Sequence, residues 1–408
     1  MRPFGPKVNR RHFLASATLM AASVTGADSS TNQPARGAAP ALLNLNDLLE
    51  PIRSANKVPA LTAALLTGGR LRGVGAVGIR KGGSPIPVKG TDLWHIGSCT
   101  KALTATLAGY YAERRKIQWD TTIVEALPDL RDTMHAAYRD VTLTQLLQHR
   151  GGLPTQADTR LWDEAWALRG SPMEQRFQFV KGTLAKEPEF TPGTKFNYSN
   201  QGYAVLGHML ERVVGQSWET LMREQIFRPL LMTMSGFGVP GTIGLIDQPW
   251  GHKWKDEKLE PLQVDNPPAI APAAGVHCSI WDFARFGLFH LHGARGEGHM
   301  LKPETFARLH TPPEGQDYAM GWIRLERDWA QGHALTHNGS NTLNFAMVWL
   351  APKIGFGAHV VTNIGGESGE KACDETVQAL IKKYVLASSE TAQPEDSSEK
   401  KSEASEPN

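Results

Sequence analysis

The amino-acid sequence predicts an α/β fold of the α+β type, with an antiparallel sheet flanked by helices and an inserted all-helical subdomain. Strand-like stretches occur at residues 58–79 and again at residues 318–362, and a helical pattern fills residues 120–227 between them. A chain built in this order most simply places its two ends in one sheet. We therefore expect the helical subdomain, at about residues 98–300, to lie beside that sheet, with a catalytic cleft between the two parts.

The length and charge of the chain limit the class of protein that it encodes. Its 408 residues are enough for a sizeable core and two subdomains. The 41% of hydrophobic residues and the formal net charge of +2 give no indication of a nucleic-acid partner. We expect a small-molecule or short peptide substrate, and the oligomeric state stays open.

The first predicted elements are a short helix and a hairpin. Residues 42–52 can form the helix. Residues 58–66 and 71–79 have the composition of strands, and Gly68-Gly69 between them is typical of a tight hairpin turn.

Capping residues mark the predicted helices of the middle region. Thr142, Ser217 and Ser279 each precede a helical stretch, Gly215 follows one, and Pro303 stands where a first helical turn begins. The helices predicted in this way cover residues 143–147, 173–184, 203–213, 218–226 and 280–292, with one more from residue 303. Strand character returns at residues 318–325, 334–337, 344–350 and 356–362, and a helix at about 370–385 closes the domain.

The two ends of the chain differ in composition from its middle. Residues 1–27 contain Arg10-Arg11 followed by a short apolar run, which resembles a twin-arginine export signal; the alternative is a disordered basic N-terminus. A linker over residues 28–44 leads to the main folded domain over residues 45–386. Residues 387–408 have almost no large apolar side chains and are expected to be disordered. The predicted location is periplasmic or secreted, without a stable membrane anchor.

The cysteine and histidine residues do not form a metal-binding pattern. Cys99, Cys278 and Cys373 are too few and too scattered for a disulfide framework or a metal cage, so we expect buried thiols. His290 and His292 are two apart on a predicted helix and face different ways. No metal and no cofactor is predicted.

The stretch around Ser98 is the first candidate catalytic feature. The apolar positions after it have helical spacing, so Ser98 lies at or near a helix N-terminus, and Lys101 is three residues further on. Residues three apart on a helix are neighbours, so the Lys101 ammonium can reach the Ser98 hydroxyl as nucleophile and activator. The alternative is an ordinary N-cap serine followed by a surface lysine.

Two further stretches carry candidate residues. Tyr198 and Asn200 lie just ahead of a predicted helix; a tyrosine becomes a useful general base only if a cation such as Lys101 lowers its pKa. The run His337-Asn338-Gly339-Ser340 ends a predicted strand, and its glycine lets the backbone approach a ligand closely. Each stretch alone is also compatible with a structural role.

Taken together, these stretches resemble a known family. Ser-Xaa-Xaa-Lys at 98–101, Tyr-Xaa-Asn at 198–200 and His-Xaa-Gly at 337–339 are similar to the three motifs of the penicillin-recognising serine hydrolases, which are class C β-lactamases, DD-carboxypeptidases and related esterases. The resemblance spans about residues 45–385. It implies the β-lactamase/penicillin-binding-protein fold and an acyl-serine mechanism.

The resemblance also implies residue roles. Ser98 would be the acylated nucleophile, Lys101 and Tyr198 the proton-handling pair, and Asn200 a contact to the substrate amide. His337 would face the substrate, and the N–H groups of Ser98 and Ser340 would form the oxyanion hole, with Gly339 between His337 and Ser340.

One departure bears on the substrate. Class C β-lactamases have a lysine where this chain has His337, and a histidine is mostly neutral near pH 7 and only partly protonated at about pH 6. The sequence therefore predicts an exported serine hydrolase acting on an ester or amide, in the manner of an esterase or DD-carboxypeptidase. The alternatives are a true β-lactamase and a non-catalytic penicillin-binding sensor.

Overall fold

The computed structural model describes residues 41–387, and residues 42–387 belong to one compact unit. The predicted export signal over residues 1–27, most of the predicted linker and the predicted disordered tail from residue 388 lie outside the described residues. Within residues 41–387, no helix is both long and apolar enough to cross a bilayer. Cys99, Cys278 and Cys373 are free and buried, as predicted.

A seven-stranded sheet forms the centre of this unit. Its spatial order is β1-β3-β2-β12-β11-β10-β9, so strands from the two ends of the chain lie side by side, as predicted. The strands are β1 (Leu43–Asn44), β2 (Ala60–Thr67), β3 (Arg70–Gly78), β9 (Ile323–Arg327), β10 (Gly332–Ser340), β11 (Phe345–Ala351) and β12 (Phe356–Thr362). All pairings are antiparallel except the short parallel pairing of β1 with β3.

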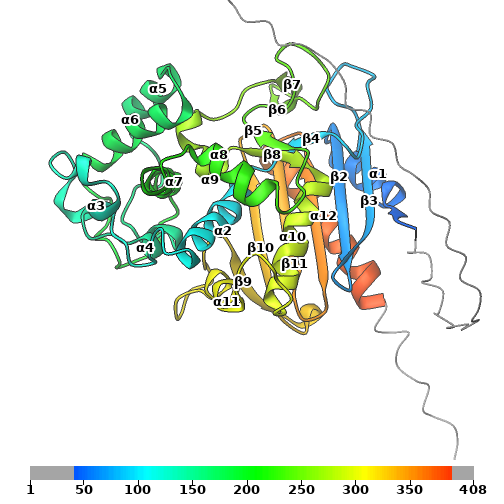
Figure 1. Cartoon of the computed structure of the whole chain (residues 1–408). Helices are drawn as coiled ribbons and strands as arrows, with labels where there is room; N and C mark the ends of the chain where they lie inside the picture. Colours follow the sequence, from blue (N-terminus) through cyan, green and yellow to red (C-terminus); the bar gives the residue numbers. More distant parts are fainter. Residues whose placement is uncertain (1–40, 388–408) are drawn as a thin grey trace, which may run out of the picture. The chain divides into compact units, whose positions relative to one another are not determined.

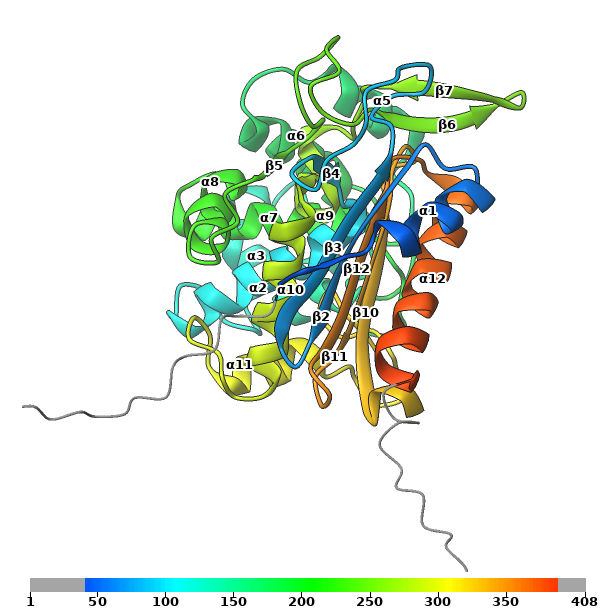
Figure 2. The ribbon, with the colours of Figure 1, turned by 90° about the vertical axis from the view of Figure 1, so that its right-hand side faces the viewer.

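Helices cover both faces of the sheet. Helices α1 (Asn46–Ala55) and α12 (Gly366–Ile381) pack on one face, and α10 (Ile280–Ala294) packs on the other (Figure 2). Strand β12 is buried along its whole length because it lies between these two layers. The antiparallel sheet with flanking helices is therefore confirmed.

The turn between β2 and β3 shows why the local sequence signals worked. Gly68 and Gly69 have φ angles of 58° and 68°, a left-handed pair that suits a two-residue hairpin turn. Thr142 and Ser279 cap α4 (Leu143–Leu147) and α10 by accepting hydrogen bonds from backbone N–H groups, and Gly215 ends α7 (Asn200–Val214) with a φ of 82°.

The middle region contains most of the remaining helices (Figure 1). They are α2 (Thr100–Glu113), α3 (Ile123–Ala126), α4 (Leu143–Leu147), α5 (Thr159–Ala167), α6 (Pro172–Leu184), α7 (Asn200–Val214), α8 (Trp218–Met222), α9 (Ala271–Ala274) and α11 (Pro303–His310).

The prediction that residues 98–300 are all helical is wrong. This range also contains the strands β5 (Ser235–Phe237), β6 (Gly251–Lys255), β7 (Lys258–Leu262) and β8 (Val276–Ser279). Strand β8 lies between β5 and β4 (Leu93–His95), and β6 pairs with β7. Strands of three to five residues are too short for an alternating apolar pattern to stand out.

Candidate active site

Ser98 lies in a single helical turn that leads into α2. This turn, η1 (Gly97–Cys99), places Ser98 partly exposed while Lys101 in the first turn of α2 is fully buried. Lys101 Nζ lies 3.0 Å from Ser98 Oγ, so the two side chains meet as their three-residue spacing predicts.

Two further contacts of Lys101 involve the N–H groups of its amine. Lys101 Nζ lies 2.7 Å from Asn200 Oδ1 and 3.1 Å from the Ala273 carbonyl oxygen. Both are acceptors, so each takes one N–H of the amine. Burial places the pKa of Lys101 well below its ordinary value, which favours the neutral amine. A neutral amine has only two N–H groups, and its lone pair is then left for the Ser98 hydroxyl.

Tyr198 lies beside this pair. Its ring centroid is 4.6 Å from Lys101 Nζ, and the Tyr198 hydroxyl forms a hydrogen bond with Ser98. Burial raises the pKa of Tyr198 above its ordinary value, and the hydrogen bond with Ser98 offsets only part of this rise. The sequence-based expectation that a Lys101 cation lowers the pKa of Tyr198 is therefore wrong. Burial therefore favours an uncharged Lys101 amine and an uncharged Tyr198 phenol.

Glycines bring the turn around Ser98 close to β10. A Cβ atom on Gly97, whose φ is 50°, would overlap the Ser340 nitrogen, and one on Gly339 would overlap the Ser98 nitrogen. The backbones of η1 and β10 thus touch, with the amides of Ser98 and Ser340 at their contact. The Gly339 backbone approaches another part of the chain here, whereas the sequence analysis placed a ligand against it.

A cleft of about 480 Å³ opens beside these residues. Its lining includes Ser98, Asn200 and Ser340, three residues predicted from the sequence. The remaining lining residues are Thr155, Gln156, Ala157, Thr159, Trp162, Gln201, Asn266, Ile270, Ala274, Asn341 and Thr342. None of the lining residues among the described part of the chain is Asp, Glu, Lys or Arg, so the wall of the cleft is uncharged.

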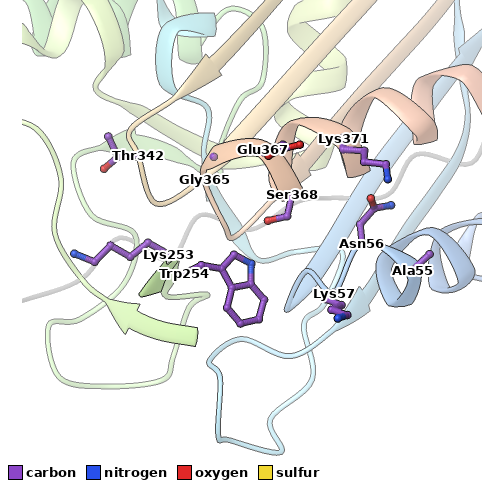
Figure 3. A pocket seen from close by; sticks show the side chains of 11 residues that line it. Ala55, Asn56, Lys57, Lys253, Trp254, Thr342, Gly365, Glu367, Ser368 and Lys371 are labelled. Carbon is purple, nitrogen blue, oxygen red and sulfur yellow. The ribbon is translucent and has the colours of Figure 1, made fainter. Parts of the chain in front are cut away.

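A second hollow of about 550 Å³ lies at the start of α12 and shares only Thr342 with the cleft (Figure 3). Lys253 and Lys371 line it, but each has a carboxylate nearby, Glu260 at 3.4 Å and Glu375 at 3.9 Å. The cleft at Ser98 is therefore the candidate active site, because it combines a nucleophile with a buried amine.

The comparison with known protein families agrees with this site. The profile of the family described as Beta-lactamase matches residues 45–382. The chain belongs to the Beta-lactamase family. This family member is accordingly a serine hydrolase that works through an acyl-serine intermediate.

Relatives of similar sequence agree with the assignment, and solved structures have a similar fold. The chain is 25% identical over 333 residues to "Penicillin-binding protein 4" of Amycolatopsis lactamdurans, covering 78% of this chain and 84% of that protein. It is 27% identical over 285 residues to a "Beta-lactamase" of Pseudomonas fluorescens, covering 68% and 73%. A class C beta-lactamase structure superposes with a TM-score of 0.68 at 18% identity, covering 83% of this chain and 94% of that chain. The octameric penicillin-binding protein homologue from Pyrococcus abyssi also gives 0.68, at 21% identity, covering 83% and 76%.

His337 of this Beta-lactamase family member does not face the substrate cleft, contrary to the sequence-based expectation. Its side chain is 3% exposed and does not line the cleft. His337 Nδ1 lies 2.5 Å from the Asn338 carbonyl oxygen, and Nε2 lies 3.2 Å from the Tyr318 hydroxyl. Burial lowers the pKa of His337 to about 3, so the ring stays neutral across the physiological range.

Hydrogen-bond directions through Tyr318 fix the tautomers of two buried histidines. The Ser199 N–H donates to His149 Nδ1, so a neutral His149 carries its proton on Nε2, which lies 3.2 Å from the Tyr318 hydroxyl. The Tyr318 hydroxyl then donates to His337 Nε2, and His337 Nδ1–H donates to Asn338. The rings of His149 and Tyr198 pack at 4.3 Å between centroids. These residues therefore form a wall behind Tyr198.

Several residues of the site were not predicted from the sequence. Trp162 reaches the cleft from α5, a helix that the sequence analysis missed although Asp158 caps it. Asn266 and Asn341 also line the cleft, and neither belongs to a recognisable motif. Among residues 41–387, no group of three or more His, Cys, Asp or Glu side chains is placed to hold a metal ion.

Proposed function

We propose that this protein is an exported serine hydrolase that cleaves an uncharged ester or amide through an acyl-Ser98 intermediate. The observation that carries the proposal is the set of contacts around Lys101 Nζ. Two carbonyl-type acceptors take two N–H groups, so a neutral amine has only its lone pair left for Ser98 Oγ at 3.0 Å. This arrangement supports a general base that can deprotonate the nucleophile without first losing a proton to solvent.

The first half of the reaction forms the acyl-enzyme. Ser98 Oγ attacks the substrate carbonyl carbon while its proton moves to Lys101 Nζ. The oxyanion that develops is bound by the N–H groups of Ser98 and Ser340. The Tyr198 phenol protonates the leaving oxygen or nitrogen as the bond to the acyl carbon breaks, and it regains a proton from Lys101.

The second half releases the acyl group. Water attacks the acyl carbon from the cleft, and its proton moves to the Tyr198 and Lys101 pair, which returns a proton to Ser98 Oγ. Asn200 binds Lys101 through its Oδ1, so its Nδ2 is available to donate to the substrate acyl amide or ester carbonyl.

The uncharged cleft is the reason for proposing a neutral substrate. Penicillins carry a carboxylate, and burying a carboxylate without a cationic partner is unfavourable. His337 is neutral and buried, so it does not supply that partner. A true β-lactamase stays the second candidate, because a relative of that description is 27% identical.

A substrate panel with mass detection tests the proposal. We would measure hydrolysis of p-nitrophenyl acetate and butyrate, nitrocefin and a D-Ala-D-Ala peptide, and record the intact mass of the protein over time. The expected result is fast ester turnover with a transient acyl mass on wild type and none on Ser98→Ala. A lasting penicillin adduct without turnover would identify a sensor, and faster nitrocefin than ester turnover would identify a β-lactamase.

Export is a separate part of the proposal and rests on residues outside the structure. If Arg10-Arg11 directs twin-arginine export, replacing both arginines by lysine leaves the precursor in the cytoplasm. Normal processing of the Arg10→Lys, Arg11→Lys double variant would remove this assignment while leaving the hydrolase assignment unaffected.

A further inference from the structure

We propose that His95 and Asp265 are positioning residues that align the two N–H groups of the oxyanion hole. This inference rests on the proposed function, because it takes the amides of Ser98 and Ser340 as the oxyanion-binding groups. The Asp265 network, as we call it, consists of the Gly97 backbone N–H, His95, Asp265 and Asn341.

The hydrogen bonds of His95 have a fixed direction. The Gly97 N–H donates to His95 Nδ1 at 3.1 Å, and a backbone N–H can only donate. Nδ1 is therefore unprotonated, and the single ring proton lies on Nε2, 2.9 Å from Asp265 Oδ2. His95 is fully buried, so no water competes for either nitrogen. A neutral His95 thus connects the Gly97 amide to the Asp265 carboxylate.

Asp265 continues the network towards β10. Its side chain is 6% exposed, and its second oxygen, Oδ1, accepts a hydrogen bond from Asn341 Nδ2 at 3.2 Å. A buried carboxylate is retained in a fold only where hydrogen bonds compensate its desolvation. Both oxygens of Asp265 are used here, one on each side of the nucleophile.

The turn that follows β10 is held rigidly by side chains. Asn341 Oδ1 accepts hydrogen bonds from the backbone N–H groups of Leu343 and Asn344. Ser340 Oγ accepts from Thr342 N at 2.9 Å and donates to the Asn344 carbonyl oxygen at 2.7 Å. Thr342 has a φ of 73°, which is unfavourable for a β-branched residue and persists only where neighbours enforce it.

The Asp265 network ends next to both oxyanion-binding amides, and this is why we assign it a role in aligning them. Gly97 directly precedes Ser98, and Asn341 directly follows Ser340, so the network connects the two peptide segments that supply the oxyanion donors. Such donors stabilise a transition state only when they are fixed in advance at hydrogen-bonding distance from the developing charge. His95 is fully buried, the Asp265 side chain is 6% exposed, and neither lines the cleft, so we infer that they act through the backbone.

Two substitutions at the same position separate the two hydrogen bonds of His95. His95→Leu removes both. His95→Asn keeps an acceptor, since Oδ1 of an asparagine takes about the place of Nδ1, and loses only the link to Asp265. For His95→Leu we expect kcat with p-nitrophenyl butyrate to fall about 10- to 100-fold, the range seen when a supporting hydrogen-bond partner of a reactive group is lost. His95→Asn should restore most of that loss.

A transition-state analogue makes the test specific for the oxyanion hole. Phenylboronic acid forms a tetrahedral adduct with a serine nucleophile, and its affinity should fall by the same factor as kcat while KM for the ester changes by less than about twofold. His359→Leu is the matched control, because His359 is also a fully buried histidine and lies outside the cleft. It should keep the wild-type kcat and boronate affinity.

The outcomes separate the two proposals. If wild type forms no acyl-Ser98, the proposed function fails. If wild type is acylated and His95→Leu keeps its kcat and boronate affinity, only the positioning role is overturned; equal losses in His359→Leu overturn it too. Should His95→Leu not fold, Asp265→Asn keeps the side-chain volume and removes the charge, and an unchanged kcat in that variant is then the refuting result.

Discussion

His359 allows a quantitative test of how burial controls protonation in this protein. It lies in the middle of β12 and packs against Phe283 of α10, with 4.9 Å between ring centroids. Neither ring nitrogen has a hydrogen-bond partner among residues 41–387. Burial alone lowers the pKa of His359 to about 3. The folded protein therefore holds this ring neutral where an unfolded chain would protonate it.

The sign and size of the effect follow from proton linkage. Because the pKa is lower in the folded state, the unfolded state binds more protons below about pH 6.5, so stability is complete above that pH and is lost as the pH falls towards 3. A pKa of about 6.5 unfolded and about 3 folded gives a loss of about 2 kcal/mol between pH 7.5 and pH 5 from this residue.

His359→Leu should remove this contribution. Urea unfolding at pH 7.5, 6.5, 5.5 and 5 gives the free energy of unfolding of each protein. Between pH 7.5 and pH 5, we expect the free energy of unfolding of the variant to rise by about 2 kcal/mol relative to that of wild type. A change in packing shifts the free energy of unfolding by the same amount at every pH, so it does not alter this difference. The exposed His299→Gln variant is the control and should parallel wild type. Parallel curves for wild type and His359→Leu would refute the reasoning, since no other buried histidine differs between them.

Further predictions concern the reaction. Lys101→Arg replaces the neutral amine by a permanent cation that cannot accept a proton, so kcat in the ester assay should fall at least about 100-fold if Lys101 is the base; a mild loss would show that Lys101 is not the base. Tyr198→Phe keeps the ring packed on His149 and should also lower kcat by about 100-fold. Gly339→Ala places a Cβ on the Ser98 nitrogen and should reduce fluorophosphonate labelling of Ser98 and lower the Tm together. Since the pKa of His337 is about 3, the ratio of penicillin to ester kcat/KM should show no titration assignable to His337 between pH 8 and 6, which His337→Gln would check.

The sequence predicted those parts of the fold that depend on local signals. The β2–β3 hairpin follows from two glycines, and the starts of α4 and α10 follow from Thr142 and Ser279. Strand β9 begins at Ile323, later than predicted, because the chain reverses direction between Tyr318 and Ile323, at Gly321, whose φ is 76° and whose backbone lies against Ala102. Such a contact is set by the tertiary fold and cannot be predicted from the periodicity of apolar residues.

In the candidate site, too, contacts between residues close in sequence could be predicted, and contacts between distant residues could not. Ser98 and Lys101 are neighbours on one helical turn, so their contact was predictable. Asp265 was not, since its partners His95 and Asn341 are 170 and 76 residues away in the chain. The face of β10 that His337 occupies also could not be inferred, because it depends on which side Tyr318 and His149 pack.

The sequence alone left open which member of the Lys101 and Tyr198 pair is the base, and burial bears on this choice. A lysine next to a tyrosine suggests a cation that acidifies a phenol, but this holds only if water or an anion stabilises the charge. Lys101 is fully buried, and its three polar contacts within residues 41–387 are a hydroxyl, an amide and a carbonyl, none of which is an anion. With the pKa of Lys101 lowered and that of Tyr198 raised, both groups are uncharged before substrate binds. Charge then appears only as the oxyanion forms, where the Ser98 and Ser340 amides can stabilise it. An interaction that strengthens only in the transition state accelerates the reaction, whereas one that is equally strong in the ground state only tightens substrate binding.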